Sequence, residues 1–391
     1  MAAPLDILSP PQSVRPTLEA LGMADVAPGS RVAVAMSGGV DSSTVAALLV
    51  EAGFDVVGIT LQLYDMGSAK GRSGTCCAGS DIQDARAVAR RIGIPYYVLD
   101  FEARFKADVI EPFAAAYARG ETPIPCISCN RTVKFRDLLS VARDLGAVAL
   151  ATGHYARRIV GRNQPELHAA ADASRDQSYF LFATTKDELS YIRFPLGGAL
   201  SKAETRAHAA RLGIAIADKP DSQDICFVPN GNYAGIVAKL RPDAVEPGDI
   251  VHVDGRVLGR HVGIINFTVG QRRGVGVGGA DGSSSERLYV VKLEPEAKRV
   301  IVGPREALAT KTARLTGLNW LGDGAPSSGS VVEGEVKIRS AQAPIAARIV
   351  FRDNDAEVEF AAPEHGVAPG QACVVYDGAR LLGGGFIARA S

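Results

Sequence analysis

The hydrophobic and polar positions of the chain follow one pattern in its first half and another in its second. From residue 31 to about residue 155, short apolar runs rich in β-branched residues alternate with stretches of helical periodicity. The predicted elements are strands at 31–36, 55–64, 94–100 and 147–155 and helices at 41–53, 81–93, 102–119 and 134–145. This alternation predicts an α/β fold with a doubly wound parallel sheet.

The pattern changes twice after this region. Residues 157–248 have mostly helical periodicity broken by loops, which favours a small linker domain. From residue 247 onward, short strands separated by Gly-rich turns predict one or two small β-barrels. The predicted domains are an N-terminal extension (1–30), a nucleotide-binding catalytic domain (31–165), a helical segment with a second cysteine site (166–245), a small β-rich central domain (246–290) and a C-terminal β-barrel (291–391).

Composition narrows the class of protein without identifying a partner. Lys plus Arg and Asp plus Glu number 43 each, so the net charge is zero and any nucleic-acid contact must come from local basic strips. The chain has no apolar stretch near the ~20 residues of a membrane helix, and its first residues do not resemble a signal peptide. We therefore expect a cytoplasmic protein with no membrane partner. Six cysteines in 391 residues are too few for a disulfide scaffold, so they indicate chemistry or metal binding.

The sequence Ser-Gly-Gly-Val-Asp-Ser at residues 37–42 stands between a predicted strand and a predicted helix. Its two glycines let backbone N–H groups approach a phosphate, and the positive end of the helix points at the same place. No Gly-Lys-Ser/Thr follows, so the loop is not of the type that serves γ-phosphate transfer. Asp41 suits Mg²⁺ held against phosphates.

Two groups of cysteines are candidates for chemistry. Cys126 and Cys129 are three positions apart beside two prolines, and Cys226 lies about a hundred residues later in DSQDICF. A single cysteine is often only a small buried hydrophobic residue, which is how we interpret Cys373 and the adjacent Cys76 and Cys77.

The ordered motifs resemble those of a known family. The residue 37–42 loop resembles the PP-loop of ATP pyrophosphatases, which split ATP between its α and β phosphates. GETPIPCISCN, TGHYAR, DQSYFL, SKAETR, DSQDICF and FTVGQRRG occur in the order and rough spacing of the tRNA-specific 2-thiouridylases, from about residue 31 to the C-terminus. The resemblance implies a sulfurtransferase that uses ATP and Mg²⁺ to adenylate O2 of a wobble uridine in tRNA and puts sulfur at C2, releasing AMP and pyrophosphate.

The resemblance also implies roles for the cysteines. Cys226 would carry a persulfide received from a donor such as a cysteine desulfurase or a sulfur-relay protein. Cys129 would be the nucleophile that closes a disulfide with Cys226. Cys126 stands where many relatives have an aspartate, so the general base stays open.

Two alternatives remain at this point. In the first, Cys126, Cys129 and Cys226 ligate three irons of a [4Fe–4S] cluster that carries the sulfur. In the second, the chain is another PP-loop synthetase that needs no thiol. Both alternatives keep the nucleotide loop and differ in the cysteine chemistry.

The resemblance further implies two sets of binding residues and a substrate. The tRNA would be of the Lys, Glu or Gln type. The predicted ATP-binding residues are Ala35, Met36, Ser37, Gly38, Gly39, Val40, Asp41, Ser42, Leu61 and Gly153. The predicted tRNA-binding residues are Ile124, Pro125, Cys126, His154, Arg175, Asp176, Gln177, Arg339, Ser340 and Gln371. Without the resemblance, Leu61 would be interpreted as a core residue.

Overall fold

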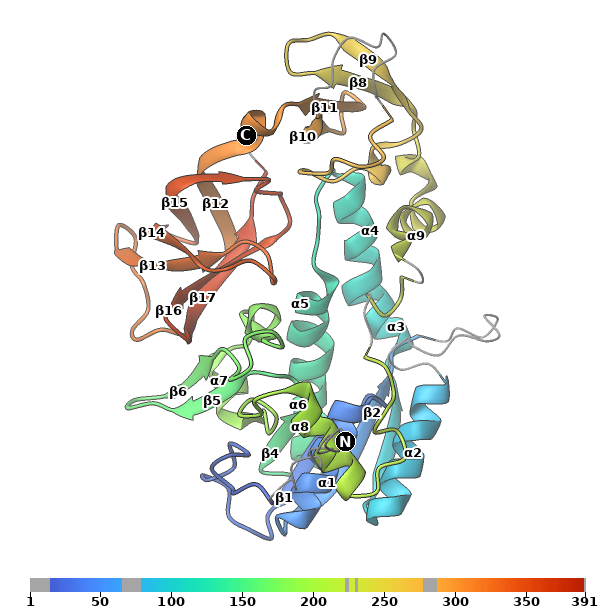
Figure 1. Cartoon of the computed structure of the whole chain (residues 1–391), viewed down its shortest axis with the longest axis vertical. Coiled ribbons are helices and arrows are strands. Elements are labelled where there is room, and N and C mark those ends of the chain that lie inside the picture. The colour runs from blue at the N-terminus through green and yellow to red at the C-terminus, as the bar shows by residue number, and fades with distance from the viewer. Residues whose placement is uncertain (1–14, 65–78, 222–224, 229–230, 277–286, 390–391) are drawn as a thin grey trace, which may run out of the picture.

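The computed structural model describes residues 15–64, 79–221, 225–228, 231–276 and 287–389. Cys76 and Cys77 lie outside these residues. Figure 1 shows an α/β domain, a small sheet at the opposite end of the molecule and a β-barrel beside the helices that join them. No helix within the described residues is both long enough and apolar enough to cross a membrane.

The α/β domain is built on a five-stranded parallel sheet. Its order is β3 (Tyr96–Asp100), β2 (Asp55–Gln62), β1 (Arg31–Ala35), β4 (Ala149–Thr152) and β7 (Ile192–Arg193). The central strands are apolar throughout because helices cover both faces of the sheet. This confirms the predicted α/β class. The strand order reverses between β1 and β4, and such switch points are where parallel sheets bind ligands.

The helices of this domain fall close to the predicted positions. They are α1 (Val40–Glu51), α2 (Gly79–Ile92), α3 (Glu102–Phe105), α4 (Glu111–Ala118), α5 (Pro125–Cys129) and α6 (Leu138–Asp144). Segments of π-helix at 106–110 and 130–137 join α3 to α4 and α5 to α6. The helix predicted from residue 134 therefore begins at Pro125, because proline fits the first turn of a helix, where its missing N–H is not needed.

Residues 166–245, predicted as one helical segment, contribute to three parts of the molecule. The hairpin of β5 (Arg157–Val160) and β6 (Pro165–His168) extends the barrel sheet by pairing with β17. After α7 (Lys186–Tyr191), α8 (Lys202–Arg211) packs on α1, and α9 (Tyr233–Leu240) packs on α4.

The small sheet has the order β10 (Tyr289–Glu294), β11 (Arg299–Gly303), β8 (Gly248–His252) and β9 (Val257–His261). The domain boundary predicted at residue 290 falls inside β10. The strands on both sides of that boundary belong together because Val290, Val300 and Val302 share one core with Ile250.

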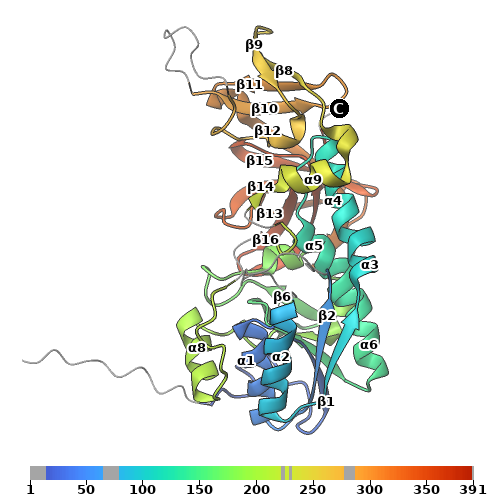
Figure 2. The ribbon, with the colours of Figure 1, turned by 90° about the vertical axis from the view of Figure 1, so that its right-hand side faces the viewer.

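The C-terminal strands form a closed antiparallel barrel, as predicted. Its strands are β12 (Ala309–Trp320), β15 (Asp355–His365), β14 (Ile345–Arg352), β13 (Val331–Lys337), β16 (Ala372–Asp377) and β17 (Arg380–Ile387). Pairing of β12 with β17 closes the sheet and removes its open edges. Figure 2 shows the barrel between the α/β domain and the β8–β11 sheet.

Candidate functional site

The SGGVDS loop lies at the switch point of the sheet, between β1 and α1. The Ser42 hydroxyl accepts from the Ser37 N–H at 3.0 Å, contacts the Ser37 hydroxyl at 3.2 Å and donates to the Gly39 carbonyl at 3.3 Å. These bonds curl the loop over the start of α1. Because Gly39 has no side chain to cap the helix, the first N–H groups of α1 are left for an anion.

Two glycines fix the close approach of this loop to its neighbours. Gly38 has φ +75°, and a Cβ atom there would lie 2.1 Å from the Asp81 carbonyl oxygen. A Cβ atom on Gly153 would lie 2.8 Å from the Ser42 nitrogen. The predicted ATP residues from Ala35 to Ser42 and Gly153 therefore meet at one place. Leu61 is 6% exposed in β2 and belongs to the apolar core.

Two lysines that the sequence analysis did not single out lie at the same loop. The Lys202 ammonium is 2.6 and 2.7 Å from the two Asp41 oxygens and 2.7 Å from Asp221. Lys219 donates to the Gly38 carbonyl at 2.9 Å and pairs with Asp81 and Asp84, each at 2.6 Å.

The sequence contained a signal for Lys202. It is the first residue of α8, whose N-cap Ser201 accepts from the Glu204 N–H. A cation in the first turn opposes the helix dipole, so a lysine there suggests a role other than helix stability.

Asp41 has the charge expected of a magnesium ligand but is already engaged. Besides Lys202, its carboxylate accepts from the Tyr155 hydroxyl at 2.9 Å. Within the described ranges, no three His, Cys, Asp or Glu side chains gather as a metal site. Since Mg²⁺ usually combines one or two carboxylates with phosphate oxygens, Asp41 fits as one ligand of a nucleotide-bound ion.

The cysteines of the described residues are thiols with different surroundings. Cys126 is exposed, Cys129 and Cys373 are buried, and Cys226 is half-buried. Cys126 and Cys129 are both on α5, three positions apart. Cys129 belongs to the same apolar cluster as Phe227, and Cys226 packs against that cluster. The two predicted reactive thiols therefore both contact the core that the α/β domain shares with the barrel.

The Cys226 segment is anchored at the carboxyl end of β2. The Tyr64 hydroxyl donates to the Cys226 carbonyl at 2.7 Å. The Phe227 ring packs edge-to-face on Phe105 and Phe113, with centroids 5.8 and 5.2 Å apart. Asp221, five residues before Cys226 in the sequence, pairs with Lys202, which also contacts Asp41 of the nucleotide loop.

The three thiols do not fit the iron–sulfur alternative. Cluster ligands converge on one centre. In the part of the chain that the structure describes, Cys126, Cys129 and Cys226 do not come together as such a group. Their exposure also differs, from the exposed Cys126 to the buried Cys129. No step of the reaction below runs through a cluster.

His154 follows β4 and is half-buried. Its Nδ1 lies 2.9 Å from the Thr152 hydroxyl, and its ring packs edge-on to Phe135 and Phe194. Burial, together with the charge of Lys134, lowers the pKa of His154 to about 3. The imidazole is therefore neutral at pH 7 and would contact RNA without a positive charge.

The DQSYFL region uses two predicted tRNA residues for its own folding. Asp176 accepts from the Ala170 N–H and from both the N–H and hydroxyl of Ser178, at 2.9 to 3.1 Å. Gln177 accepts from the Tyr155 N–H at 2.9 Å. Arg175, the third predicted tRNA residue of this region, instead pairs with Asp221 at 2.9 Å, and its side chain is partly exposed.

The predicted tRNA residues of the barrel also have intramolecular partners. Arg339 donates to the carbonyls of His365 and Gly366 at 2.7 and 2.8 Å. Gln371 donates to the Thr122 carbonyl at 2.7 Å. Ser340 lies in the turn that follows β13.

The loop that holds Gln371 touches the loop before α5. Thr122 donates its N–H to the Pro369 carbonyl at 2.7 Å. Ile124 and Pro125, the N-cap and first residue of α5, come two and three positions later. The barrel thus touches the loop that leads to Cys126.

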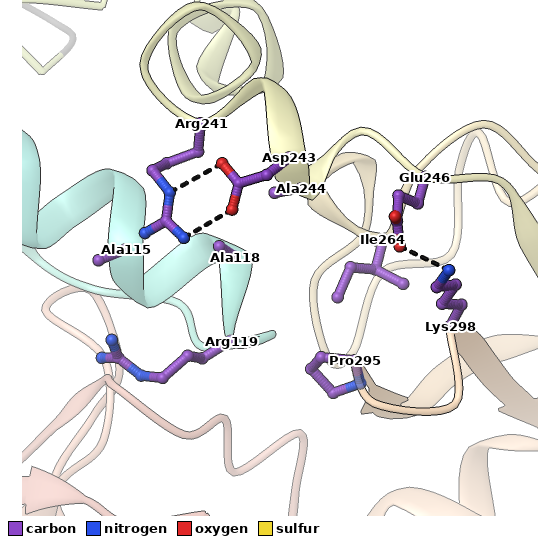
Figure 3. Close-up of a pocket in the computed structure, with 10 residues that line it drawn as sticks. All are labelled: Ala115, Ala118, Arg119, Arg241, Asp243, Ala244, Glu246, Ile264, Pro295 and Lys298. Atoms are coloured by element: carbon purple, nitrogen blue, oxygen red, sulfur yellow. Dashed lines mark hydrogen bonds and ion pairs between the residues drawn. The ribbon is translucent and has the colours of Figure 1, made fainter.

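A cavity of about 340 Å³ lies elsewhere, between α4 and the small sheet (Figure 3). It is lined by Ala115, Ala118, Arg119, Arg241, Asp243, Ala244, Glu246, Ile264, Pro295 and Lys298. Its charges are paired, Arg241 with Asp243 and Lys298 with Glu246. None of the predicted site residues lines it.

Comparisons with known proteins cover almost the whole chain. The family model described as "tRNA methyl transferase HUP domain" matches residues 30–230. The "tRNA methyl transferase PRC-barrel domain" matches residues 237–304, and the "Aminomethyltransferase beta-barrel domain" matches residues 310–387.

Curated relatives match over nearly their full length. The chain is 61% identical to the tRNA-specific 2-thiouridylase MnmA of Rhodospirillum centenum, over 95% of both chains. It is 57% identical to that of Paracoccus denitrificans over 95% of both chains, and 58% identical to that of Dinoroseobacter shibae over 96% of this chain and 98% of the other. This likeness, over nearly the full length of each relative, establishes that the chain belongs to the tRNA-specific 2-thiouridylase family.

Proposed function

We propose that this protein is an ATP-dependent tRNA 2-thiouridylase that replaces the C2 oxygen of a wobble uridine with sulfur. The observation that carries the proposal is that Cys129 lies in the apolar core against which Cys226 packs, while Asp221, five residues before Cys226, is ion-paired to Lys202, whose ammonium also contacts Asp41 of the nucleotide loop. An enzyme that couples ATP cleavage to sulfur transfer needs both sites within reach of one base.

In the first step, ATP activates the uridine. The phosphates lie against the N–H groups of the loop and of the start of α1, where Asp41 would be one ligand of a nucleotide-bound Mg²⁺ that would neutralise phosphate charge. Uridine O2 attacks the α-phosphorus, pyrophosphate leaves, and O2 becomes part of an adenylate. The oxygen is now a good leaving group.

In the second step, sulfur replaces this oxygen. A Cys226 persulfide attacks C2, and AMP departs with the former O2. The Cys129 thiolate then attacks the Cys226 Sγ, which breaks the bond between the two sulfurs of the adduct and leaves the outer sulfur on C2. The products are 2-thiouridine and a Cys129–Cys226 disulfide, which a dithiol reductant returns to two thiols.

The partners follow from this chemistry. A cysteine desulfurase or a sulfur-relay protein supplies the sulfane sulfur to Cys226. The tRNA, of the Lys, Glu or Gln type, contacts the loop at Ile124 and Pro125, the region of His154 and Arg175, and the barrel near Arg339 and Ser340. Because tRNA is the substrate, we place the enzyme in the cytoplasm.

Cysteine variants test this proposal. Cys129→Ser and Cys226→Ser are expected to lose 2-thiouridine formation, measured by mass spectrometry of digested tRNA, while keeping tRNA affinity. Affinity persists because phosphate contacts lie elsewhere. Cys373→Ala is the matched control: burial in the barrel raises the pKa of Cys373 to about 12, so this thiol is unreactive and its variant keeps activity.

Three outcomes would contradict the proposal. Full thiolation by both Cys129→Ser and Cys226→Ser would remove the thiol mechanism. Pyrophosphate release that does not depend on tRNA would place the activated oxygen on another substrate. Iron and sulfide in stoichiometric amounts after anaerobic purification would instead favour the cluster alternative.

A further inference from the structure

Lys202 is buried between two carboxylates at the nucleotide loop. The residue is 8% exposed and lies within 2.7 Å of oxygens from both Asp41 and Asp221. Asp41 is the second residue of α1, so the Lys202 ammonium lies beside the helix end that faces the phosphate site. The contact between α1 and α8 holds the two helix starts together.

This arrangement creates a problem for a triphosphate. The site already holds the carboxylates of Asp41 and Asp221, and ATP brings several further negative charges. The loop N–H groups and the dipole of α1 supply only partial positive charge, and Arg175 and Arg206 lie at Asp221. Lys202 is a full positive charge that contacts Asp41 in the loop and can offset part of the added charge.

We propose that Lys202 is a phosphate ligand of this enzyme, held by Asp41 and Asp221 before ATP binds and transferred to the β- or γ-phosphate when it does. The inference rests on the proposed use of ATP at this loop. Transfer of Lys202 also leaves the Asp41 carboxylate available for Mg²⁺. One movement of the Lys202 side chain would thus bring its ammonium to the phosphate and free Asp41 as a magnesium ligand.

The other partners of Asp221 and Asp41 keep the free-energy cost of this transfer low. When Lys202 leaves, Asp221 still has Arg175 at 2.9 Å and Arg206 at 3.9 Å. Asp41 keeps the Tyr155 hydroxyl at 2.9 Å. No carboxylate is left buried without a partner, which would otherwise cost several kcal/mol.

Lys219 is a poorer candidate for the same role. It pairs with Asp81 and Asp84 and also donates to the Gly38 carbonyl, which ties the Gly38 turn to α2. Its withdrawal would break its hydrogen bond to the Gly38 carbonyl and two ion pairs at once. We therefore assign Lys219 to holding the shape of the loop.

The test compares ATP, AMP and adenosine on the full-length protein by calorimetry with Mg²⁺. Lys202→Met keeps the length of the side chain and removes its charge. ATP is expected to bind about 10- to 100-fold more weakly, as for loss of one charged hydrogen bond, while the dissociation constants of AMP and adenosine change less than about threefold. Lys186→Met, remote from the loop and bonded to the Gly322 carbonyl, is the matched control and should change none of the three.

A second variant keeps the inference testable if Lys202→Met does not fold. Asp221→Asn removes one of the two carboxylates that compete with phosphate for Lys202, so ATP should bind about threefold more tightly or better. In the Lys202→Met background the same change should have a smaller effect. A gain of equal size in both backgrounds would mean that Asp221 repels ATP directly and would contradict the exchange.

The failures of the two proposals can be told apart. If the wild-type protein did not bind ATP, both the proposed function and this inference would fall. If the wild type bound ATP and Lys202→Met bound it equally well, or lost ATP, AMP and adenosine alike, only the phosphate-ligand role would be lost.

Discussion

Gly38 and Gly39 are neighbours that differ in what a methyl group would meet. At Gly38 a Cβ atom would lie 2.1 Å from the Asp81 carbonyl oxygen, in a left-handed conformation. At Gly39, where φ is −87°, the nearest atom would be the Ser37 hydroxyl oxygen at 3.5 Å. The first position depends on the absence of a side chain, whereas the second has room for one.

We therefore expect Gly38→Ala to destabilise the protein and Gly39→Ala to leave its stability nearly unchanged. The left-handed conformation alone costs about 1 to 2 kcal/mol for a residue with a Cβ atom, and the contact with backbone adds to it. Thermal unfolding of both variants measures the difference. Equal melting temperatures would show that the loop does not hold the described shape in solution.

His154 makes stability depend on pH. Its pKa is about 3 in the folded state and 6.5 for an ordinary histidine, so the unfolded chain binds more protons between these values. The contribution of His154 to the free energy of unfolding is therefore fully present above pH 6.5 and is lost as the pH falls toward 3. His208 and His261, whose pKa values burial also lowers, add to the same trend.

His154→Gln should accordingly flatten the loss of stability on acidification. Urea unfolding at pH 7.5 and pH 5 gives the change in the free energy of unfolding for the variant and the wild type. Between pH 7.5 and pH 5 the wild type should lose more free energy of unfolding than His154→Gln does. An equal loss in both proteins would mean that the His154 ring is protonated as readily when folded as when unfolded.

At the scale of elements, the Cys226 segment is held against α3 and α4 by aromatic packing. Phe227 is 6% exposed and touches Phe105 and Phe113, which come from α3 and α4. The Tyr64 hydroxyl adds a hydrogen bond to the Cys226 carbonyl. Phe227, the residue after Cys226, thus positions the Cys226 thiol.

Phe227→Ala should loosen this attachment and expose Cys226. Alkylation of Cys226, followed by peptide mass spectrometry, should become roughly tenfold faster or more, since 1.4 kcal/mol lost locally changes an opening equilibrium tenfold. Phe351→Ala, in the barrel core, is the control that removes the same ring without touching this segment. Equal alkylation rates in wild type and Phe227→Ala would show that Phe227 does not hold the thiol in place.

The regular elements of the α/β domain could be predicted from the sequence because a short stretch of residues specifies each one. Apolar runs such as that of residues 32–35 specify buried strands, and the SGGVDS turn specifies the start of α1. The start of the predicted 134–145 helix at Pro125 was missed because CIS at 126–128 gives too short a periodic pattern. Lys202 and Lys219 were missed because their partners, Asp41 and Asp81, are more than a hundred residues away in the sequence.

At the scale of the whole molecule, the barrel is docked on the α/β domain by polar contacts that no local pattern predicts. The Tyr179 hydroxyl donates to the Ala372 carbonyl at 2.9 Å, and the Ser178 hydroxyl lies 3.0 Å from that of Tyr376. All four positions are buried. Asp176, Gln177 and Gln371, for which tRNA contacts are predicted, also form hydrogen bonds within the protein, to Ala170, Tyr155 and Thr122 respectively.

Gln371→Ala distinguishes a framework role from RNA contact. Loss of its hydrogen bond to the Thr122 carbonyl should lower the free energy of unfolding by about 0.5 to 1.5 kcal/mol in the absence of tRNA. Ser340→Ala, for which we propose only an RNA contact, should weaken tRNA binding with little change in stability. An unaltered stability for Gln371→Ala would return Gln371 to the RNA surface.

The central claim is that sulfur passes from Cys226 to tRNA while Cys129 takes up the bond that is released. The most direct measurement is one anaerobic turnover of enzyme loaded with a Cys226 persulfide, given ATP and tRNA without reductant, followed by mass spectrometry of protein peptides and digested tRNA. The account predicts 2-thiouridine, AMP, pyrophosphate and a Cys129–Cys226 disulfide in equal amounts. Thiolated tRNA with both cysteines recovered as thiols, or with Cys226 joined to Cys126, would contradict it.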